Sequence, residues 1–177
     1  AGTGATVGKF HGPSGMMKAG LGIYAAQVGA VQCAAIVAVN ALGDIIDYDD
    51  KHLMAGLLTE DKSAMADTVK VMYDEIERNR ALWGGNTTIG CVITNAKLDK
   101  SQCNKLASIA HNGFAQAIRP VHSTADGDTI FLMASGEVEV GVDAVGALVT
   151  ECMGRAINRA ALTAEPAYGL KAARDFC

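Results

Sequence analysis

The chain has 177 residues, of which half are apolar and 19% are charged, and this composition excludes an intrinsically disordered protein. A net charge of −4 without a basic block argues against nucleic acid as a partner, as does the small number of aromatic residues. The longest apolar run, around Ala34–Val39, falls well short of the roughly 18 residues of a membrane-spanning helix, so we expect no membrane partner either. We expect a single domain over residues 1–177.

The first part of the chain is predicted to contain two neighbouring strands. A glycine-rich segment over residues 1–22 leads into strands at about Leu21–Val28 and Val31–Asn40. Both strands are rich in alanine, which predicts that both of their faces are buried or closely packed. A turn and an acidic loop are expected over Ala41–Asp50.

A helix is predicted over Glu60–Asn79, with Thr59 as its N-cap. Glu60 and Asp61 suit the positive end of a helix dipole. Apolar residues recur at helical spacing along one face, namely Met65, Val69, Met72 and Ile76.

A strand over about Thr88–Thr94 is followed by a second predicted helix. Asp99 and Gln102 have the spacing of a capping box, and Pro120 is expected to end the helix. The expected inner stripe consists of Cys103, Leu106, Ala110, Phe114 and Ala117.

The last predicted elements are a strand over Thr129–Ala134 and a helix over about Val142–Arg159. The core face of this helix is expected to carry Val145, Val149 and Cys152. Strand pairs that alternate with long helices predict a layered α/β or α+β domain.

The cysteines indicate a reducing compartment. They are odd in number, and none form a C-x-x-C pair, which argues against zinc and redox motifs: Cys33, Cys91, Cys103, Cys152 and Cys177. We therefore expect a cytoplasmic protein, in which the glycosylation sequon at Asn86 has no role.

The glycine-rich start does not match a phosphate-binding loop. Gly8-Lys9 is followed by Phe10, the glycine spacing is one residue off, and no hydroxyl follows the lysine to hold Mg²⁺. Lys9 is then either a surface lysine or a desolvated one whose lowered pKa suits base chemistry.

Asp126 and Asp128 flank Gly127 and, taken alone, are best interpreted as a turn. Neither a histidine-rich stretch nor a further acidic cluster lies near them in the sequence, so we predict no metal and no other cofactor. His111 and His122 are more simply interpreted as packing or surface residues. The sequence has no G-x-S-x-G, so a nucleophile-elbow hydrolase is unsupported.

The junction "GGNTT" at residues 84–88 allows two interpretations. Gly-Gly-Asn before a β-branched run is ordinary turn chemistry, which alone favours a plain loop-to-strand junction. A threonine hydroxyl needs a base, however, and an N-terminal threonine has one in its own amino group. Attack of the Thr87 hydroxyl on the Asn86 carbonyl would create that terminus.

Several segments resemble the self-processing peptidases of the L-aminopeptidase/D-esterase type, which include β-peptidyl aminopeptidases and nylon-oligomer hydrolases. The matching segments are "AGTGATVGK" (1–9), "VAVNALG" (37–43), "GNTTIGCVITNA" (85–96), "LASIAHNGFAQAIRPVHSTADGDTIF" (106–131) and "ECMGRAI" (151–157). The resemblance covers nearly the whole chain. It implies an N-terminal-nucleophile-like αββα layered fold.

The resemblance also implies a site. Cleavage between Asn86 and Thr87 would yield residues 1–86 and 87–177, with Thr87 the nucleophile of both processing and hydrolysis. Lys9 matches the active-site lysine of the family, and Asn40 matches the asparagine that helps to hold the oxyanion. The acidic pair Asp126 and Asp128 is expected to orient the nucleophile and its amino group.

The leading hypothesis is a cofactor-free amide hydrolase or aminopeptidase that acts on small peptides or other short amides through an acyl-enzyme. The alternatives are a non-catalytic assembly or binding domain and an acyltransferase. Family members carry a segment upstream of the glycine-rich motif, here either lost or a separate chain, and commonly assemble as tetramers of processed units. We therefore expect a homo-oligomer and count the upstream segment among the partners.

Overall fold

The centre of the fold is a four-stranded sheet. The computed structural model describes residues 2–78 and 84–176. In the sheet, β3 (Leu21–Val28), β4 (Val31–Ala38), β7 (Ile89–Ala96) and β9 (Thr129–Val138) lie side by side in that order. The first three strands pair antiparallel, whereas β7 and β9 run parallel.

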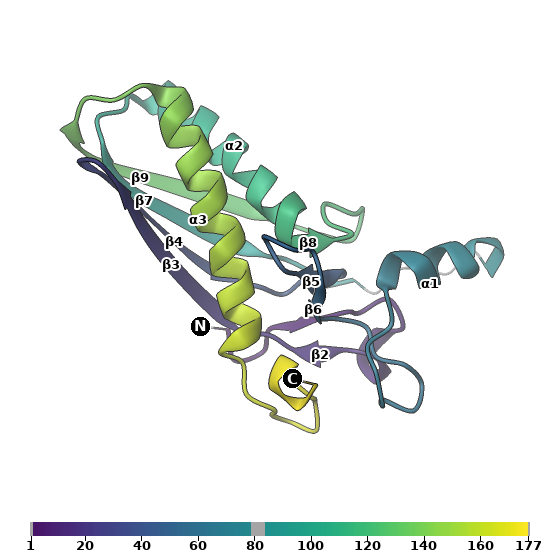
Figure 1. Ribbon diagram of the computed structural model, residues 1–177. Coiled ribbons are helices and arrows are strands. Elements are labelled where there is room, and N and C mark those ends of the chain that lie inside the picture. Colours follow the sequence, from purple (N-terminus) through teal and green to yellow (C-terminus); the bar gives the residue numbers. More distant parts are fainter. Residues whose placement is uncertain (1, 79–83, 177) are drawn as a thin grey trace.

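Two long helices cover one face of this sheet (Figure 1). α2 (Lys100–Ala117) packs on α3 and β9, and α3 (Val142–Leu162) packs on β3 and β4. The capping box of α2 is confirmed, because Asp99 accepts the N–H of Gln102 while the Gln102 side chain accepts the N–H of Asp99. The predicted core residues of α3 are buried, as is the predicted α2 stripe apart from the half-buried Cys103.

The opposite face of the sheet is apolar and largely exposed. Alternation along each strand places small and large apolar side chains there, and the largest exposed ones are Leu21, Ile23, Ile89, Ile93, Phe131 and Met133. The prediction that both faces are buried or closely packed was therefore wrong for the first strand, Leu21–Val28, whose outward-facing residues are exposed.

A smaller sheet and a two-stranded ribbon adjoin one end of the large sheet. The small sheet consists of β5 (Asp44–Ile46) between β6 (Leu53–Ala55) and β8 (Ile118–Arg119). The ribbon pairs β1 (Thr6–Val7) with β2 (Met17–Lys18). β5 lies where the sequence predicted a turn, because its backbone pairs with both neighbours.

The predicted helix over Glu60–Asn79 was wrong in its extent. The structure contains only α1 (Thr68–Asp74) and a 3₁₀ turn, η2 (Ile76–Arg78), and position 79 lies outside the described residues. Asp67, not Thr59, caps α1.

Side-chain hydrogen bonds explain why the helix begins later than predicted. Thr59 donates its hydroxyl to Asp61 in a turn. Asp44 accepts the N–H and the hydroxyl of Thr68, and burial raises the pKa of this carboxyl to about 6. These bonds hold residues 59–67 in turns and start the helix at Thr68.

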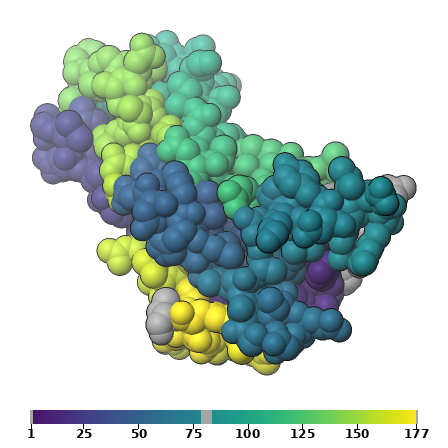
Figure 2. All heavy atoms as spheres, turned by 45° about the vertical axis from the view of Figure 1, so that its right-hand side comes forward, coloured from purple at the N-terminus to yellow at the C-terminus, as the bar shows by residue number. Residues whose placement is uncertain are grey.

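Two further 3₁₀ turns, η1 (Gly12–Ser14) and η3 (Ala173–Asp175), complete the described elements. In Figure 2 the tip of the β3–β4 hairpin stands beside the start of α3 at one end of the molecule. No helix in the two described ranges has the length and apolar character needed to cross a membrane. The cysteines within these ranges are free thiols, and Cys177 lies outside them.

Candidate active site

The site lies at one end of the large sheet, where the parallel strands β7 and β9 begin. Ile89 of β7 is in register with Thr129 of β9, so the segments that precede these strands lie side by side. The pairing continues beyond the strands as a bridge between Asn86 and Asp126. This topology brings residues 86–88 against residues 126–128.

Thr87 is held at both its amide and its hydroxyl. Its N–H donates to the backbone carbonyl of Asn40 at 2.8 Å, and its Oγ1 donates to the carbonyl of Asn86 at 2.6 Å. The same Asn86 carbonyl accepts the N–H of Gly127 at 2.9 Å. The carbonyl before Thr87 is thus polarised by a fixed backbone donor while the hydroxyl lies against it.

Gly127 allows this approach because it has no side chain. A Cβ at this position would lie 2.9 Å from Thr87 Oγ1. That distance is shorter than real Cβ contacts, so any other residue would displace the hydroxyl.

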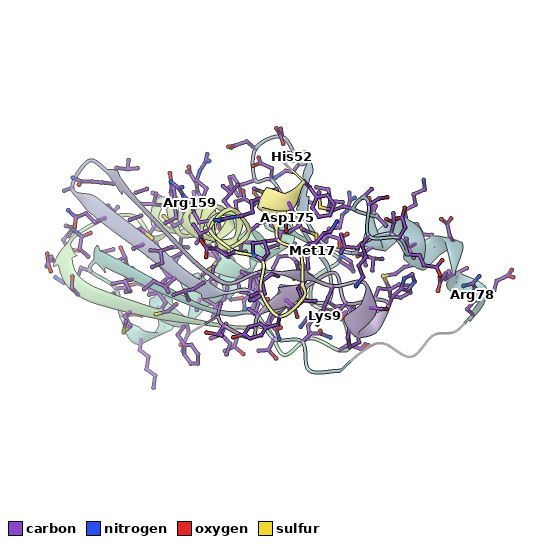
Figure 3. All side chains as sticks on the ribbon, turned by 90° about the horizontal axis from the view of Figure 1, so that it is seen from below. Lys9, Met17, His52, Arg78, Arg159 and Asp175 are labelled. Carbon is purple, nitrogen blue, oxygen red and sulfur yellow. The ribbon has the colours of Figure 1, made fainter. Side chains whose placement is uncertain are left out.

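Lys9 is buried beside Asn40. Lys9 Nζ donates to Asn40 Oδ1 at 2.5 Å, and Asn40 Nδ2 donates to the carbonyl of Gly85 at 3.0 Å. Lys9 is only 3% exposed. Burial lowers its pKa to about 8, against the opposing effect of Asp126. Lys9 is therefore a desolvated lysine and not a surface one. Figure 3 labels Lys9 at the end of the large sheet that adjoins the two-stranded ribbon of β1 and β2.

A close backbone approach places Lys9. Gly8 and Lys9 donate their N–H groups to the carbonyls of Gly43 and Leu42, at 2.9 and 2.8 Å. Gly8 has a φ of +69°, and a Cβ on it would lie 2.0 Å from the Leu57 nitrogen. The glycine-rich segment thus serves close packing against the chain around Gly43.

Asp126 belongs to a loop that precedes β9 and is not part of a hairpin. Its Oδ2 accepts the N–H and the hydroxyl of Ser123 at 2.9 and 2.7 Å. Its Oδ1 lies 3.4 Å from the Leu42 nitrogen, on the chain that also pairs with Lys9. Asp126 is also the carboxylate whose charge raises the pKa of Lys9 against burial.

Asp128 binds the chain on the other side. Its Oδ1 accepts the N–H of Thr88 at 2.9 Å, and its Oδ2 lies 2.9 Å from His122 Nδ1. The structure therefore brings together all five side chains singled out from the sequence, Lys9, Asn40, Thr87, Asp126 and Asp128. Sequence reasoning missed Ser123, Gly127 and the contact of His122, although the run "HSTADGD" contains all of them.

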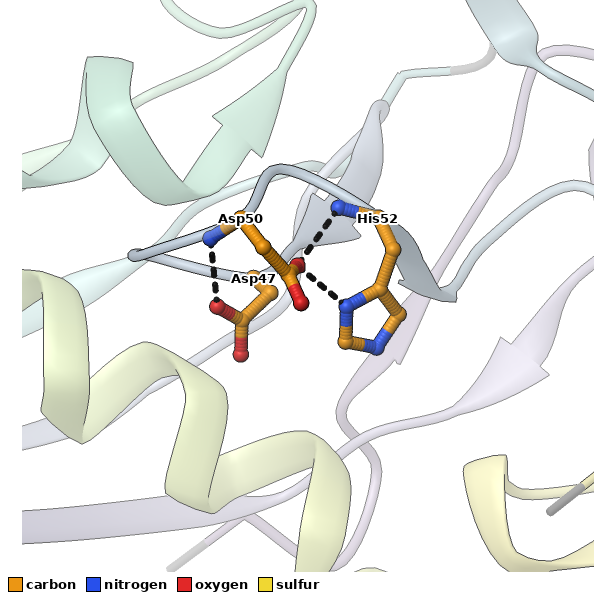
Figure 4. Close-up of side chains that lie close together, drawn as sticks. All are labelled: Asp47, Asp50 and His52. Atoms are coloured by element: carbon orange, nitrogen blue, oxygen red, sulfur yellow. Dashed lines mark hydrogen bonds and ion pairs between the residues drawn. The ribbon is translucent and has the colours of Figure 1, made fainter.

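A possible cation site lies elsewhere. Asp47, Asp50 and His52 place three ligand atoms within 4.8 Å of one another, the only such group found in the described ranges (Figure 4). The hydrogen bonds of a turn explain this geometry: Asp47 Oδ1 accepts the N–H of Asp50, and Asp50 Oδ1 accepts the N–H of His52. Asp50 and His52 are exposed, and Asp47 is half-buried.

The comparisons with known proteins identify the family. The model of peptidase family S58 matches residues 1–174. The chain belongs to peptidase family S58. An uncharacterized aminopeptidase of Mycobacterium tuberculosis H37Rv is 31% identical over 183 aligned positions, which cover 92% of this chain and 53% of the relative. A 6-aminohexanoate-oligomer endohydrolase of Paenarthrobacter ureafaciens is 26% identical, covering 80% of this chain and 44% of the relative.

Solved structures confirm the fold class. The L-aminopeptidase D-Ala-esterase/amidase from Ochrobactrum anthropi, described as a variant of the Ntn-hydrolase fold, matches 95% of this chain and 45% of its own with a TM-score of 0.61 and 16% identity. A β-aminopeptidase from Burkholderia matches with a TM-score of 0.57 and 18% identity, covering 90% of this chain and 44% of its own. The S58 chain described here spans about half the length of the curated relatives it matches. Its helices and large sheet form an α-on-β pair of layers, with the apolar sheet face turned outward.

Proposed function

We propose that this S58 chain is the catalytic part of a self-processing amide hydrolase, with Thr87 as the nucleophile of both cleavage and hydrolysis. The observation that carries the proposal is the Thr87 hydroxyl, 2.6 Å from the Asn86 carbonyl oxygen that Gly127 N–H also binds. The proposed substrates are small peptides or other short amides. The family and the names of its relatives, aminopeptidases and amide-oligomer hydrolases, support this class of reaction.

Self-cleavage proceeds by attack of Thr87 Oγ1 on the Asn86 carbonyl carbon. The C–N bond breaks, the Thr87 nitrogen leaves as an amine, and an ester joins the two residues. Water then hydrolyses the ester, which restores the hydroxyl and leaves a carboxylate on Asn86. Gly127 N–H is placed to stabilise the negative charge that develops on the carbonyl oxygen.

Lys9 is the proposed base for the first step. A lysine with a pKa near 8 is neutral in roughly a tenth of molecules at pH 7, which suffices for proton abstraction. Asp126, which raises this pKa against burial, favours the protonated amine that forms. Lys9, with Asp126 beside it, can therefore accept the proton of the Thr87 hydroxyl and return it to the leaving amine.

Hydrolysis reuses the same groups once the chain is cut. The new amino group of Thr87, with an ordinary pKa near 8, joins Lys9 as a base. Asn40 Nδ2, which donates to the Gly85 carbonyl in the uncut chain, is the proposed donor to the substrate oxyanion. An acyl-enzyme on Thr87 is then released by water.

The test is the substitution Thr87→Ala. We expect intact-mass spectrometry to show the wild-type protein cut between Asn86 and Thr87 and the variant uncut, with hydrolysis of short amides abolished. Thr88→Val is the matched control: Thr88 is fully buried, and its hydroxyl has no hydrogen-bond partner in the part of the chain described, so this variant should still be cut. Cleavage at the same bond in Thr87→Ala would refute the proposal.

The remaining expectations stay predictions. They are the cytoplasmic location, the tetramer of processed units and the upstream segment as a partner. The exposed apolar face of the sheet supports a covering layer of polypeptide, since a patch of that kind is rarely left open to solvent.

A further inference from the structure

A series of side-chain contacts leads from the surface of α2 to the residue after Thr87. His111 Nδ1 on α2 lies 3.3 Å from His122 Nε2. His122 Nδ1 lies 2.9 Å from Asp128 Oδ2, and Asp128 Oδ1 accepts the N–H of Thr88 at 2.9 Å. Three side chains thus link a helix surface to the backbone next to the nucleophile.

We propose that His122 is a positioning residue for the self-cleavage described above. It holds the Asp128 carboxylate, which holds the N–H of Thr88 and so keeps the Thr87 hydroxyl against the Asn86 carbonyl. The inference rests on the proposed function, because it assigns His122 a part in that reaction. His122 touches neither reacting atom and acts through Asp128.

The surroundings hold the His122 ring in place. It stacks on the fully buried Phe114, with ring centroids 6.0 Å apart and planes 25° from parallel, while His111 packs edge-on against the same ring. The Asp128 side chain is only 3% exposed, so it depends on donors from the protein. Loss of the His122 donor leaves one of its two oxygens without that hydrogen bond.

The protons in this series are constrained. A carboxylate only accepts, so His122 Nδ1 carries a hydrogen, and the contact between the two imidazoles needs a single hydrogen between His111 Nδ1 and His122 Nε2. Asp128 is the charged partner of His122, and it also opposes the lowering of the His111 pKa by burial.

The backbone at His122 permits a sharp test. Its φ is +55°, which asparagine and glycine tolerate better than other residues. His122→Asn keeps a donor at the position of Nδ1 and removes the titratable ring, whereas His122→Gly keeps the backbone and removes the donor. His52→Asn, in an exposed turn, is the control for loss of a histidine.

We expect His122→Gly to slow self-cleavage by about ten- to a hundredfold, as for the loss of a hydrogen bond to a charged group, and His122→Asn to remain within a few-fold of wild type. Equal cleavage rates for the wild-type protein, His122→Gly and His122→Asn would overturn the proposal.

A second measurement does not depend on cleavage. In ¹⁵N-labelled full-length protein carrying Thr87→Ala, the Thr88 amide resonance should move and exchange faster in His122→Gly, and stay near its original position in His122→Asn and His52→Asn. An unchanged Thr88 amide in His122→Gly would refute the positioning role. If wild type is never cut, the proposed function fails on its own, and the Thr88 amide still decides the role of His122.

Discussion

The amino-terminal segment buries two lysines in neighbouring regions, and their partners differ. Lys9 is 3% exposed and Lys18 is 6% exposed. Lys18 Nζ donates to the carbonyls of Ala5 and Ala19 at 2.9 and 2.8 Å, with Gly2 at 3.5 Å. Its hydrogen bonds to these three carbonyls therefore connect β2 with the chain before β1.

The partners of Lys9 belong to the candidate site. Its Nζ donates to Asn40 Oδ1, whose amide group also donates to the Gly85 carbonyl, and the charge of Asp126 opposes the lowering of its pKa by burial. Burial lowers the pKa of both lysines, but only Lys9 lies against the residues that hold Thr87. Burial alone therefore does not distinguish the two lysines, whereas the identity of the acceptor does.

The largest difference is expected in the rate of self-cleavage. Lys9→Met should slow cleavage between Asn86 and Thr87 by roughly 10²- to 10⁴-fold, the usual contribution of a general base. Lys18→Met, followed by the same mass spectrometry under conditions where it is folded, should be cut within a few-fold of the wild-type rate. A Lys9→Met protein cut at the wild-type rate would remove Lys9 from the reaction.

For the free energy of unfolding, the larger loss is expected in Lys18→Met and the smaller in Lys9→Met. Lys18→Met leaves the carbonyls of Ala5 and Ala19 without their donor and should lower the free energy of unfolding by about 2–4 kcal/mol. Lys9→Met should cost less, because it removes a single hydrogen bond together with a poorly solvated charge. Urea titration of both variants on a Thr87→Ala background measures the free energy of unfolding. Equal losses of this free energy would contradict the expected difference between the two lysines.

The smallest effect concerns pH. If Lys9 is the base, the cleavage rate should rise about tenfold per pH unit up to its pKa of about 8 and then level off. The same depressed pKa means that the unfolded chain binds more protons between pH 8 and the ordinary value of 10.5, so stability should rise with pH across that window. A flat rate profile between pH 6 and 8 in the wild-type protein would exclude this base.

Local signals in the sequence were enough for part of the fold. α2 was predicted from a capping box and an apolar stripe, both of which depend only on nearby residues. The predicted helix over Glu60–Asn79 was wrong because its beginning is set by Asp44, a residue distant in the sequence that takes the N–H and hydroxyl of Thr68. Periodicity has no information about such a bond.

For the site, the residue types and the resemblance pointed to the candidate residues: a threonine after a glycine-rich turn, a lysine among small residues, and a pair of aspartates. How these residues meet depends on the fold, since Lys9 and Asn40 are 31 positions apart and Thr88 and Asp128 are 40 apart. The parallel register of β7 and β9 aligns the two loops, and the contact of His122 with Asp128 follows from that alignment. Residue types limit the possible reactions, whereas the distances that select one reaction arise from strand pairing and packing.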